Sequence, residues 1–467
     1  MIDYSYLPSV CIQGLGFVGS AMSVAVAQAK DLNNNPLYNV IGVDLPTKSG
    51  MKIVSEINSG KFPFKCSDNK LLRSFQKCIE KGNLTATTDD SVYEMADIVI
   101  VDVHLDIELE KNKQDTNIYF EPFIEAIKTL GRRIQENCLV IIETTVPPGT
   151  CDNIVIPTLR ESFKERGLNA DKVMVAHSYE RVMPGREYLD SIVNFWRVYS
   201  SNTDIAANEC EKFFNSIINT KKFPLTRLAK PISTETAKVL ENSYRAVNIA
   251  FIEEWGRFSE RVNFDLYEVI DAIRMRPTHK NIRQPGFGVG GYCLTKDSLF
   301  ARWSAKNFFD IQDINFDFCM ESIALNRKMP LVSLNYTRGI LGTLSGKKIL
   351  VMGVSYREDV ADTRFSPTET YVRKAISEGA IVECNDPLVS QWGEMPEVSM
   401  VKEIEDVSIY DLVIFSVPHE HYKSLDLSKW AGKTKIFDGN RVLTNKQRQS
   451  IIDNNGFIFS IGRGEVL

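Results

Sequence analysis

Near its N-terminus the chain reads Ser9-Val10-Cys11-Ile12-Gln13, followed at once by Gly14-Leu15-Gly16-Phe17-Val18-Gly19. The first five residues are typical of a short buried strand, and the small and apolar residues 20–29 predict a helix packed closely on a sheet. A second strand is predicted at Asn39-Val40-Ile41-Gly42-Val43, directly before the carboxylate of Asp44. This order of strand, glycine turn, helix, strand and acidic residue is typical of a dinucleotide-binding βαβ unit.

Each part of this fingerprint has a physical role. Gly14 permits the tight turn, Gly16 lets a pyrophosphate approach the backbone, and Gly19 allows the helix to pack closely on the strand. We expect Asp44 to hydrogen-bond the adenine ribose and, because a carboxylate repels the extra phosphate of NADP, to favour NAD. The separation between the glycines and Asp44 exceeds the usual ~20 residues. The polar residues 31–36 are interpreted as the insertion responsible.

The composition indicates a globular protein of several domains. The chain has 467 residues, enough for about three domains of ordinary size. Hydrophobic residues make up 43% and charged residues 25%, which is typical of a folded chain and argues against disorder. The net charge is −5 and no tract of lysine and arginine is present, so nucleic acid is not an expected partner.

The sequence also indicates a cellular compartment. The first six residues lack the basic and then apolar layout of a signal peptide, and no apolar run is long enough to span a bilayer. Nine cysteines are scattered without a Cys-x-x-Cys pair, which argues against a disulfide framework and against a metal site. We therefore expect a reduced, cytoplasmic protein without a membrane segment.

The pattern of apolar runs predicts an α/β protein with two doubly wound Rossmann-like domains joined by a central helical segment with a long helix. The expected boundaries are 1–223 for the NAD-binding domain, 224–330 for the central segment and 331–467 for the second Rossmann-like domain. The second domain lacks the full glycine fingerprint, so it serves a different ligand or none. Further strands are predicted at residues 97–101, 138–142, 172–176, 346–354, 381–387 and 412–417.

Polar turns follow several of these strands. Thr144-Thr145-Val146-Pro147 and Tyr179-Glu180-Arg181 come directly after two apolar runs. Ligands of open α/β sheets gather at the carboxyl ends of the strands, so both turns are candidate binding sites, with ordinary loops as the alternative. Arg364 lies before a predicted helix start and is interpreted either as a phosphate clamp or as a surface arginine.

A long helix is predicted from about Ser233 to beyond Glu260. Lys238, Asn242 and Arg245 recur at i, i+4 and i+7, which places them on one face of this helix. Such a face either receives an anionic ligand or is simply solvated. Because the rest of the helix is largely apolar, two copies can bury each other, and we expect a homodimer through this helix.

Four glycines in six residues precede a cysteine in Gly286-Phe287-Gly288-Val289-Gly290-Gly291-Tyr292-Cys293-Leu294-Thr295-Lys296-Asp297. Glycines expose backbone N–H groups to a ligand. If the second half is the first turn of a helix, Cys293 and Asp297 share a face, and a thiol at a helix N-terminus beside a lysine favours the nucleophilic thiolate. The alternative is an inert cysteine after a flexible turn.

In its order of motifs the chain resembles the UDP-glucose/GDP-mannose dehydrogenase family, which oxidises the C6 alcohol of a nucleotide sugar to a carboxylate with two NAD, through a thioester. The resemblance runs from about residue 10 to about residue 463 and is most specific at residues 287–297. It implies NAD as the cofactor, a UDP-sugar as the substrate, a role in polysaccharide biosynthesis, and a homodimer.

The resemblance also implies roles for individual residues. As catalytic residues it gives Cys293 as the nucleophile, Lys238 and Asn242 as the pair that stabilises oxyanions, Asp297 as the carboxylate that handles protons, Thr145 as the residue that holds the hydrolytic water, and Glu180 as a catalytic glutamate. The implied NAD-binding residues are Gly14, Gly16, Phe17, Val18, Gly19, Asp44, Lys48, Thr145 and Lys296. The implied substrate-binding residues are Glu180, Arg181, Lys238, Asn242, Arg245, Phe287, Gly288, Gly290, Gly291 and Arg364, the last often reaching across the dimer interface.

The sugar is less clearly indicated. Residues 179–185 and 241–250 resemble the branch that acts on UDP-N-acetylhexosamines, and Pro184 stands where the UDP-glucose branch tends to have a second glutamate. Tyr292, however, resembles the UDP-glucose branch, since the acetamido branch usually has a histidine before the cysteine. We favour a UDP-N-acetylhexosamine and keep UDP-glucose as the alternative.

One turn departs from the family pattern. After residues 98–100 the family generally has a Thr-Pro-Thr-like turn against NAD, whereas this chain has Val101-Asp102-Val103-His104-Leu105-Asp106. An extra carboxylate there is expected to weaken NAD binding or reshape its pocket. Two other functions stay open: an ordinary two-electron dehydrogenase of the hydroxyacid type, and an NAD-binding regulator without activity.

Overall fold

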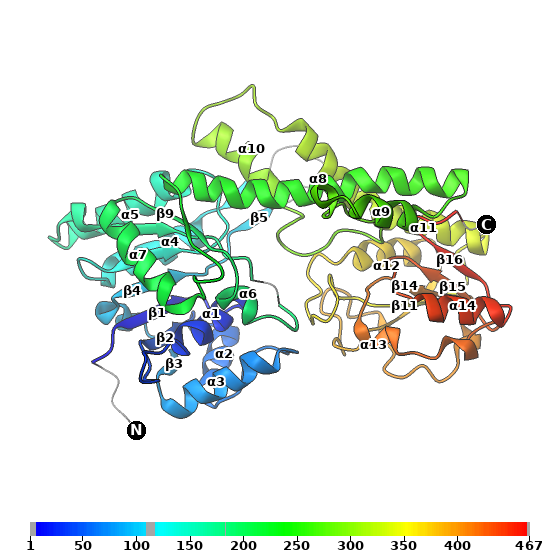
Figure 1. Cartoon of the computed structure of the whole chain (residues 1–467), viewed down its shortest axis with the longest axis horizontal. Helices are drawn as coiled ribbons and strands as arrows, with labels where there is room; N and C mark the ends of the chain where they lie inside the picture. The colour runs from blue at the N-terminus through cyan, green and yellow to red at the C-terminus, as the bar shows by residue number, and fades with distance from the viewer. Residues whose placement is uncertain (1–5, 109–116, 183, 465–467) are drawn as a thin grey trace. The chain divides into compact units, whose positions relative to one another are not determined.

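The computed structural model describes residues 6–108, 117–182 and 184–464 (Figure 1). The chain divides into two compact units, each of which has its own parallel sheet. The first unit comprises Met1–Leu240 and Leu299–Asn315, and the second comprises Glu241–Ser298 and Phe316–Leu467. The predicted α/β class with two Rossmann-like sheets is confirmed.

The sheet of the first unit has eight strands among the described residues, in the spatial order β10-β9-β8-β7-β4-β1-β2-β3. Neighbouring strands are parallel except β8 and β9. The strands are β1 (Ser9–Gln13), β2 (Asn39–Val43), β3 (Leu84–Thr87), β4 (Ile98–Val101), β7 (Leu139–Ile142), β8 (Met174–His177), β9 (Val198–Ser201) and β10 (Thr226–Arg227). A short antiparallel pair, β5 (Asp106–Glu108) and β6 (Asn117–Tyr119), lies outside this sheet. The predicted strands at residues 9–13, 39–43, 97–101, 138–142 and 172–176 are thus present to within two residues.

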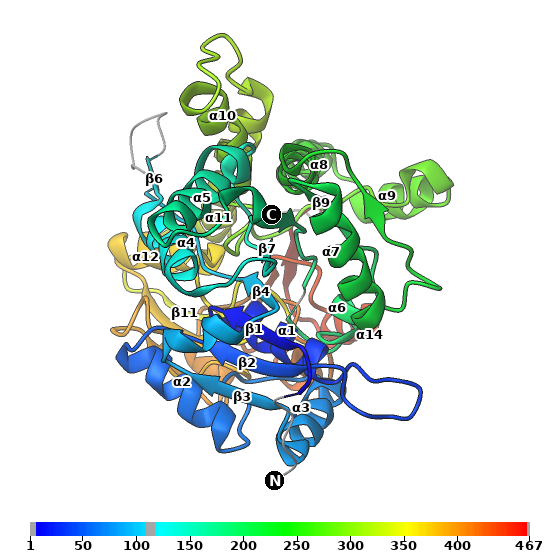
Figure 2. The ribbon, with the colours of Figure 1, turned by 90° about the vertical axis from the view of Figure 1, so that its left-hand side faces the viewer.

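Helices cover both faces of this sheet (Figure 2). One apolar cluster joins the sheet to α1 (Phe17–Ala27), α2 (Lys48–Asn58), α3 (Asn69–Lys81), α6 (Asp190–Val193) and α7 (Asp204–Ile217). A second cluster joins its other face to α4 (Glu121–Arg133) and α5 (Ile156–Glu165). The polar residues 31–36 form a turn between α1 and β2, in which Asp31 accepts hydrogen bonds from the backbone of Asn33 and Asn35.

Helix α3 shows how the sequence produces such an element. The Asp68 side chain accepts hydrogen bonds from the backbone N–H groups of Lys70 and Leu71 in the first turn, and Gly82 ends the helix in the left-handed conformation with a φ of +82°. Leu71, Phe75 and Cys78 recur at i, i+4 and i+7 and are all buried. One apolar stripe on an otherwise polar helix therefore fixes which side packs on the sheet.

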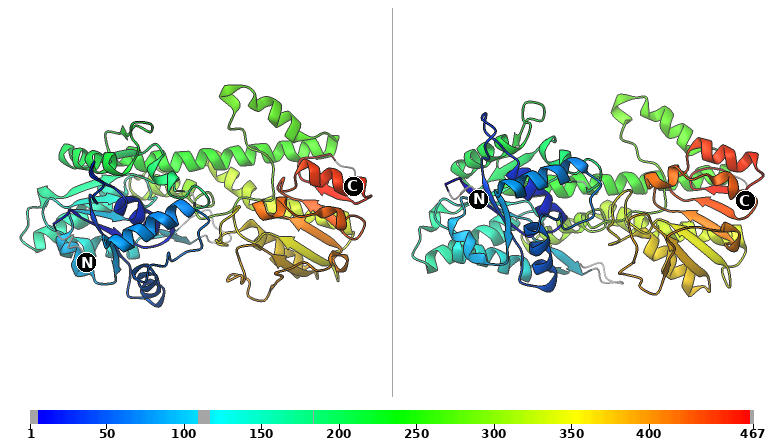
Figure 3. Two further views of the ribbon diagram at one scale, coloured as in Figure 1. Left: turned by 60° about the horizontal axis from the view of Figure 1, so that its bottom comes forward. Right: turned by 90° about the horizontal axis from the view of Figure 1, so that it is seen from below.

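The sheet of the second unit has the order β13-β12-β11-β14-β15-β16 and is parallel throughout (Figure 3). Its strands are β11 (Lys348–Met352), β12 (Ile381–Asn385), β13 (Ser399–Met400), β14 (Leu412–Phe415), β15 (Lys435–Asp438) and β16 (Ile458–Ser460). One face packs on α11 (Asp317–Leu341) and α12 (Pro367–Ser377), and the other on α13 (Glu420–Lys423) and α14 (Asn445–Asp453).

The predicted long helix is α8 (Pro231–Val262), which has residues in both units, as does α10 (Asp297–Asn307). A shorter helix, α9 (Leu266–Arg274), follows α8. The division into three domains at 1–223, 224–330 and 331–467 stays a prediction.

Candidate active site

The turn between β1 and α1 leaves its backbone open at Gly16. Gly14 has a φ of +94°, and a Cβ there would lie 2.8 Å from the carbonyl oxygen of Asp102. A Cβ on Gly19 would lie 1.9 Å from the carbonyl oxygen of Gly14, so only glycine lets α1 begin this close to the turn. The atom nearest to a Cβ on Gly16 is Nε2 of His104, 3.8 Å away. A phosphate group therefore has room over Gly16, at the N-terminus of α1.

The carboxylate of Asp44 lies beside this turn. Its Oδ2 accepts a hydrogen bond from the backbone N–H of Leu15 at 3.0 Å, and its Oδ1 accepts one from Leu45 at 2.7 Å. Both bonds fix the side chain at the end of β2, where the fingerprint expects it. Lys48 begins α2 and is exposed.

Buried carboxyl groups follow β4 and β7. Glu143 is almost fully buried, and its Oε1 lies 2.8 Å from Nη1 of the equally buried Arg197. The Oδ2 atom of Asp102 is buried and has no hydrogen-bond partner among the described residues. Burial, then the charges of Glu143 and Glu180, raise the pKa of Asp102 well above its usual range. Whether this turn weakens NAD binding or reshapes its pocket stays a prediction; the side chain of Asp106 lies outside the described residues.

Lys238 lies on α8 within the first unit and is buried. Its Nζ donates a hydrogen bond to the carbonyl oxygen of Glu180 at 2.8 Å and lies 3.8 Å from Oε1 of the same residue. The ring centroid of Tyr179 is 5.6 Å from the ammonium. The ammonium is thus held by the loop after β8. Arg181 supports this loop by donating hydrogen bonds to the carbonyl oxygen of Trp196 and the hydroxyl of Tyr179.

The start of α8 is fixed by buried polar contacts that the sequence analysis missed. The fully buried Nδ1 of His177 lies 2.7 Å from Oγ1 of Thr234. Burial lowers the pKa of His177 to about 3, so its ring is neutral. The carboxyl of Glu235 accepts the backbone N–H groups of Gly149 at 2.5 Å and Cys151 at 2.8 Å. These bonds tie α8 to the loop that contains Thr145, which is itself partly buried after β7.

Asn242 and Asp297 form a buried pair in the second unit. Nδ2 of Asn242 donates to Oδ2 of the fully buried Asp297 at 2.7 Å, and Nζ of Lys296 lies 3.4 Å from its Oδ1. Lys296 also lies 4.4 Å from the ring centroid of Tyr292. The hydrogen bond from Asn242 and the charge of the Lys296 ammonium therefore hold this carboxylate in one orientation.

Cys293 lies one helical turn before Asp297. The backbone N–H of Asp297 donates to the carbonyl oxygen of Cys293 at 2.9 Å, the i to i−4 bond of a helical turn, and α10 continues from there. The thiol is exposed, whereas Cys384, elsewhere in this unit, is buried. The predicted helical relationship between Cys293 and Asp297 is thus present.

The glycines of this loop pack against the second unit's own residues. A Cβ on Gly288 would lie 2.4 Å from Pro367, and one on Gly290 would lie 2.8 Å from the carbonyl oxygen of Phe365. Gly291 has a φ of +84°, and a Cβ there would lie 2.7 Å from the ring of Tyr356. The glycines therefore allow the cysteine loop to lie directly against residues 356–367. Contact of their backbone with a ligand stays a prediction.

Arg364 and Phe287 belong to the same packing. Nε and Nη2 of Arg364 donate to the carboxylate of Asp362, and its guanidinium lies 5.9 Å from the ring of Tyr292. The ring of Phe287 is fully buried against Tyr371, at a centroid distance of 5.3 Å. Phe287 is thus a core residue, while the half-buried Arg364 lies beside the cysteine loop.

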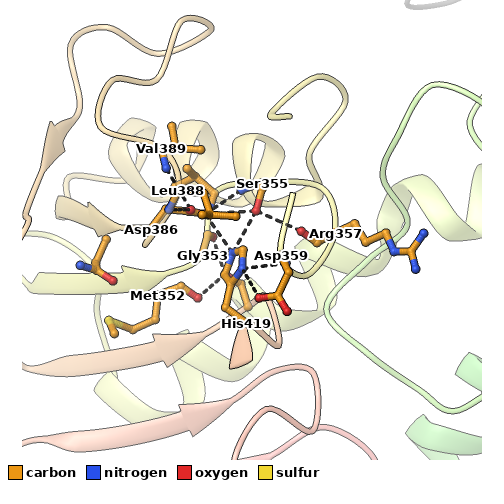
Figure 4. A network of polar contacts seen from close by, with 12 residues as sticks. Met352, Gly353, Ser355, Arg357, Asp359, Asp386, Leu388, Val389 and His419 are labelled. Carbon is orange, nitrogen blue, oxygen red and sulfur yellow. Dashed lines mark hydrogen bonds and ion pairs between the residues drawn. The ribbon is translucent and has the colours of Figure 1, made fainter. Parts of the chain in front are cut away.

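The loop after β11 is itself held by a network of polar contacts around His419 (Figure 4). Oδ2 of Asp386 accepts hydrogen bonds from the backbone N–H groups of Val354 and Ser355 and lies 3.1 Å from Nε2 of His419. Nδ1 of His419 accepts the N–H of Asp359 at 3.0 Å. The proton of the ring therefore lies on Nε2, toward Asp386, and the ring is no base for the buried Ser355 hydroxyl.

This network explains why the second sheet lacks a dinucleotide fingerprint. Gly353 and Asp386 repeat the geometry of Gly14 and Asp44, since the N–H of Gly353 donates to the carbonyl oxygen at the end of β12 and Asp386 accepts from the following residue. The place of the open second glycine is taken by Ser355, whose hydroxyl lies 3.0 Å from Nε2 of His419. A buried, hydrogen-bonded serine thus stands in the turn after β11 where the turn after β1 has an open glycine.

Comparison with known proteins identifies this arrangement. Three models of one family, the UDP-glucose/GDP-mannose dehydrogenase family, match the chain: its NAD binding domain at 8–218, its central domain at 232–327 and its UDP binding domain at 350–445. The chain belongs to this family. A UDP-N-acetyl-D-mannosamine dehydrogenase of Methanocaldococcus jannaschii is 30% identical over 464 residues, covering 98% of this chain and 97% of that protein.

Solved structures share the fold. A UDP-D-ManNAc dehydrogenase from Pyrococcus horikoshii has a TM-score of 0.81 at 24% identity, covering 98% of this chain and 100% of its own. A UDP-glucose dehydrogenase from Pyrobaculum islandicum has a TM-score of 0.82 at 21% identity, covering both chains fully. Two similar scores with two different sugars show that the fold does not determine the sugar.

As a member of the UDP-glucose/GDP-mannose dehydrogenase family, the chain is an NAD-dependent nucleotide-sugar dehydrogenase with NAD as its cofactor. Its first unit fits this cofactor. The open backbone at Gly16, the helix N-terminus at Phe17 and Val18, and the fixed Asp44 carboxylate provide what a pyrophosphate and a ribose need.

The other predicted site residues fall into two groups. Lys238 with Glu180 in the first unit, and Asn242 with Asp297 in the second, are in direct contact. Arg245 shares their side of α8 but is exposed. Their catalytic and binding roles stay predictions. No helix among the described residues combines the length and apolar character needed to cross a membrane.

Proposed function

We propose that this chain oxidises the C6 hydroxyl of a UDP-N-acetylhexosamine to a carboxylate in two steps, by way of a thioester on Cys293. The observation that best supports the thioester is an exposed thiol one helical turn before a buried carboxylate, Asp297, that Asn242 holds in place. Relatives named UDP-N-acetyl-D-mannosamine dehydrogenase support that epimer as the first to test. UDP-glucose is the alternative, which Tyr292 before the cysteine favours.

The first oxidation takes a proton and a hydride from the C6 alcohol. Lys238 stabilises the negative charge that develops on the C6 oxygen, and Asn242, one turn along α8, adds a neutral donor. The carbonyl oxygen of Glu180 already holds the ammonium, so little reorganisation is needed when the substrate binds. NAD, when bound, accepts the hydride in both oxidations.

The covalent steps use Cys293 and Asp297. The sulfur of Cys293 forms a bond to C6 of the aldehyde, and the carbonyl oxygen becomes the hydroxyl of a thiohemiacetal. Loss of the second hydride from C6, with the hydroxyl proton, gives the thioester. Water then attacks C6, Asp297 accepts its proton with Thr145 or Glu180 assisting, and the C–S bond breaks to return the thiol. One alcohol, one water and two NAD thus give one carboxylate and two NADH.

The test counts NADH formed per sugar consumed, with UDP-N-acetylmannosamine, UDP-N-acetylglucosamine, UDP-N-acetylgalactosamine and UDP-glucose. We expect two NADH with an acetamido sugar. One NADH would support a two-electron dehydrogenase of the hydroxyacid type, and none would support a regulator.

The thioester has its own test. Cys293→Ala is expected to abolish formation of the acid, while Cys319→Ala, which removes a partly buried thiol on α11, leaves it unchanged. Undiminished acid from Cys293→Ala would rule out the thioester while leaving the oxidation itself intact.

We also propose a homodimer formed through α8, in the cytoplasm. Large apolar side chains are 46–65% exposed along this helix, namely Leu240, Tyr244, Phe251, Trp255, Phe258 and Val262. A second copy that covers them removes apolar surface from water. The cytoplasm is proposed because the nine cysteines of the sequence are scattered without a Cys-x-x-Cys pair, as is typical of proteins of a reducing compartment.

A further inference from the structure

A cleft of about 640 Å³ lies in the second unit, between the C-terminal part of α8, α11 and β16. Three guanidinium groups line it, those of Arg257, Arg261 and Arg463, together with one carboxylate, that of Glu260. None of these residues has a part in the proposed oxidation. The cleft therefore has an excess of positive charge for which the catalytic mechanism gives no reason.

Arg257 is the most informative residue of the cleft. Its Nε and Nη2 atoms are buried and have no hydrogen-bond acceptor among the described residues. Buried N–H groups without an acceptor are costly, because the water that they lose on folding is not replaced. Such a group indicates that acceptor atoms reach it from outside the described chain.

The neighbouring charged groups do not supply these acceptors. Glu260, one turn from Arg257 on α8, accepts the backbone N–H of Gly462 at 2.6 Å and the hydroxyl of Tyr336. Glu253, one turn in the other direction, is buried and accepts the N–H of Gly286 at 3.4 Å. Both carboxyl groups lie close enough to Arg257 to interact with its charge, but neither accepts a hydrogen bond from its Nε or Nη2.

The remaining arginines are oriented by different partners. Nε of Arg463 lies 3.1 Å from the carboxylate of Asp265, and its guanidinium lies 5.3 Å from the ring of Tyr267. Arg261 is exposed on the last turn of α8. Arg463 is thus held in place by the fold, and Arg261 is accessible to an anion that enters the cleft.

We propose that this cleft binds a phosphorylated small molecule, with Arg257 donating hydrogen bonds to its phosphoryl oxygens and Arg261 and Arg463 beside them. Planar guanidinium groups match the geometry of phosphate oxygens. The side chains of Phe459 and Tyr336 give the cleft an apolar wall for the organic part of the ligand. Its volume lies in the usual range of small-molecule sites, roughly 300–1,000 Å³.

The test uses inorganic pyrophosphate as the probe and the full-length chain with NAD and UDP present at saturation, so that the sites proposed for them are filled. Calorimetric titration is expected to show pyrophosphate binding to the parent protein, with a dissociation constant at least ten-fold higher for Arg257→Met. Since this variant removes two buried nitrogen atoms that have no acceptor among the described residues, its unfolding temperature in phosphate-free buffer should be equal to or above that of the parent. Equal affinity in Arg257→Met would overturn the proposal.

Two further variants keep the test decisive. Arg261→Met changes an exposed side chain, cannot disturb the core, and should weaken pyrophosphate binding as well. Arg373→Met removes an exposed arginine on α12 that pairs with Glu369. This variant should leave the affinity for pyrophosphate unchanged. An equal loss in Arg373→Met would mean non-specific charge attraction. A changed dimer dissociation constant in Arg257→Met, without any effect on pyrophosphate, would assign Arg257 to a partner copy and reject the ligand site.

Discussion

Gly290 has no room for a side chain, although its backbone conformation permits any residue. A Cβ would lie 2.7 Å from Cδ of Pro367 and 2.8 Å from the carbonyl oxygen of Phe365, so either the loop that carries Cys293 or residues 356–367 must move. We expect Gly290→Ala to cost about 1–3 kcal/mol of stability, as overpacking usually does, and to lower the rate of acid formation.

Chemical denaturation and the NADH assay measure these two effects. Gly393→Ala is the matched control, because a Cβ at Gly393 would have no atom within 4 Å. If Gly290→Ala were as stable and as active as Gly393→Ala, the packing of the cysteine loop would not be needed for catalysis.

Glu253 makes stability depend on pH. Burial raises the pKa of its carboxyl to about 8, although the N–H of Gly286 and the charge of Arg257 act in the opposite direction. The folded chain therefore holds this proton between about pH 4.5 and 8, whereas the unfolded chain releases it near its usual value. The stabilising effect is complete below the unfolded pKa and is lost as the pH rises through the folded pKa, by about 1.4 kcal/mol per pH unit.

Glu253→Gln removes this titration. The free energy of unfolding is measured by urea denaturation at pH 5 and at pH 8. We expect it to fall less between these two pH values in the variant than in the parent. Glu254→Gln, one residue along and exposed, should follow the parent. A parent-like fall in Glu253→Gln would show that other buried carboxyl groups, such as Glu143 and Glu235, account for the dependence.

Among single residues, the best predictions from the sequence concern residues whose geometry depends on local spacing. Gly14, Gly19 and Asp44 have the geometry that the fingerprint requires, and Cys293 and Asp297 have the predicted helical relation. Contacts between residues far apart in the sequence were not predictable. The glycines of the cysteine loop were assigned to a ligand, since nothing in their own segment indicates that Tyr356 or Pro367 would fill the space beside them.

At the scale of elements, helix α8 carries Lys238 and Asn242, two of the proposed catalytic residues. Asn242 contacts Asp297, the first residue of α10. Asn242→Asp keeps the size of the side chain but puts a second carboxylate about 2.7 Å from that of Asp297. Two carboxylates at this distance cannot both be ionised, so one holds a proton. We expect at least a ten-fold loss of the rate of acid formation at neutral pH, with partial recovery at lower pH.

The pH profile of the NADH assay checks this. Asn248→Asp on the same helix is the control, because Asn248 is only partly buried and its Nδ2 donates to the carbonyl oxygen of Tyr244 and to no carboxylate. A flat and equal profile for both variants would mean that Asp297 takes no part in proton handling.

Elements with a clear apolar pattern were predicted, whereas α11, whose pattern is interrupted by polar residues, was not. Strands β1, β2 and β12 read as apolar runs and were found close to their predicted bounds. Helix α11 has Ser322, Asn326, Ser333 and Thr337 among the apolar residues of its buried face and Pro330 in its interior, so its apolar stripe is interrupted. Hydrogen bonds such as that from Asn326 to the carbonyl oxygen of Ala246 satisfy these groups after folding, and a sequence does not reveal them.

For the whole molecule, the prediction that follows most directly concerns assembly. The apolar side chains on α8 follow helical spacing at positions 240, 244, 251, 255, 258 and 262, so they form one exposed stripe. A single soluble chain rarely keeps such a stripe in water, and a two-fold dimer covers it with the same stripe of a second copy.

We expect Trp255→Glu, which places a charge within the stripe, to convert the dimer to a monomer at micromolar concentration. Light scattering after size exclusion measures the mass. Ile205→Glu on α7 alters a more exposed apolar side chain outside the stripe and should leave the dimer intact. A parent-like mass for Trp255→Glu, or a monomer from both variants, would remove α8 as the proposed interface.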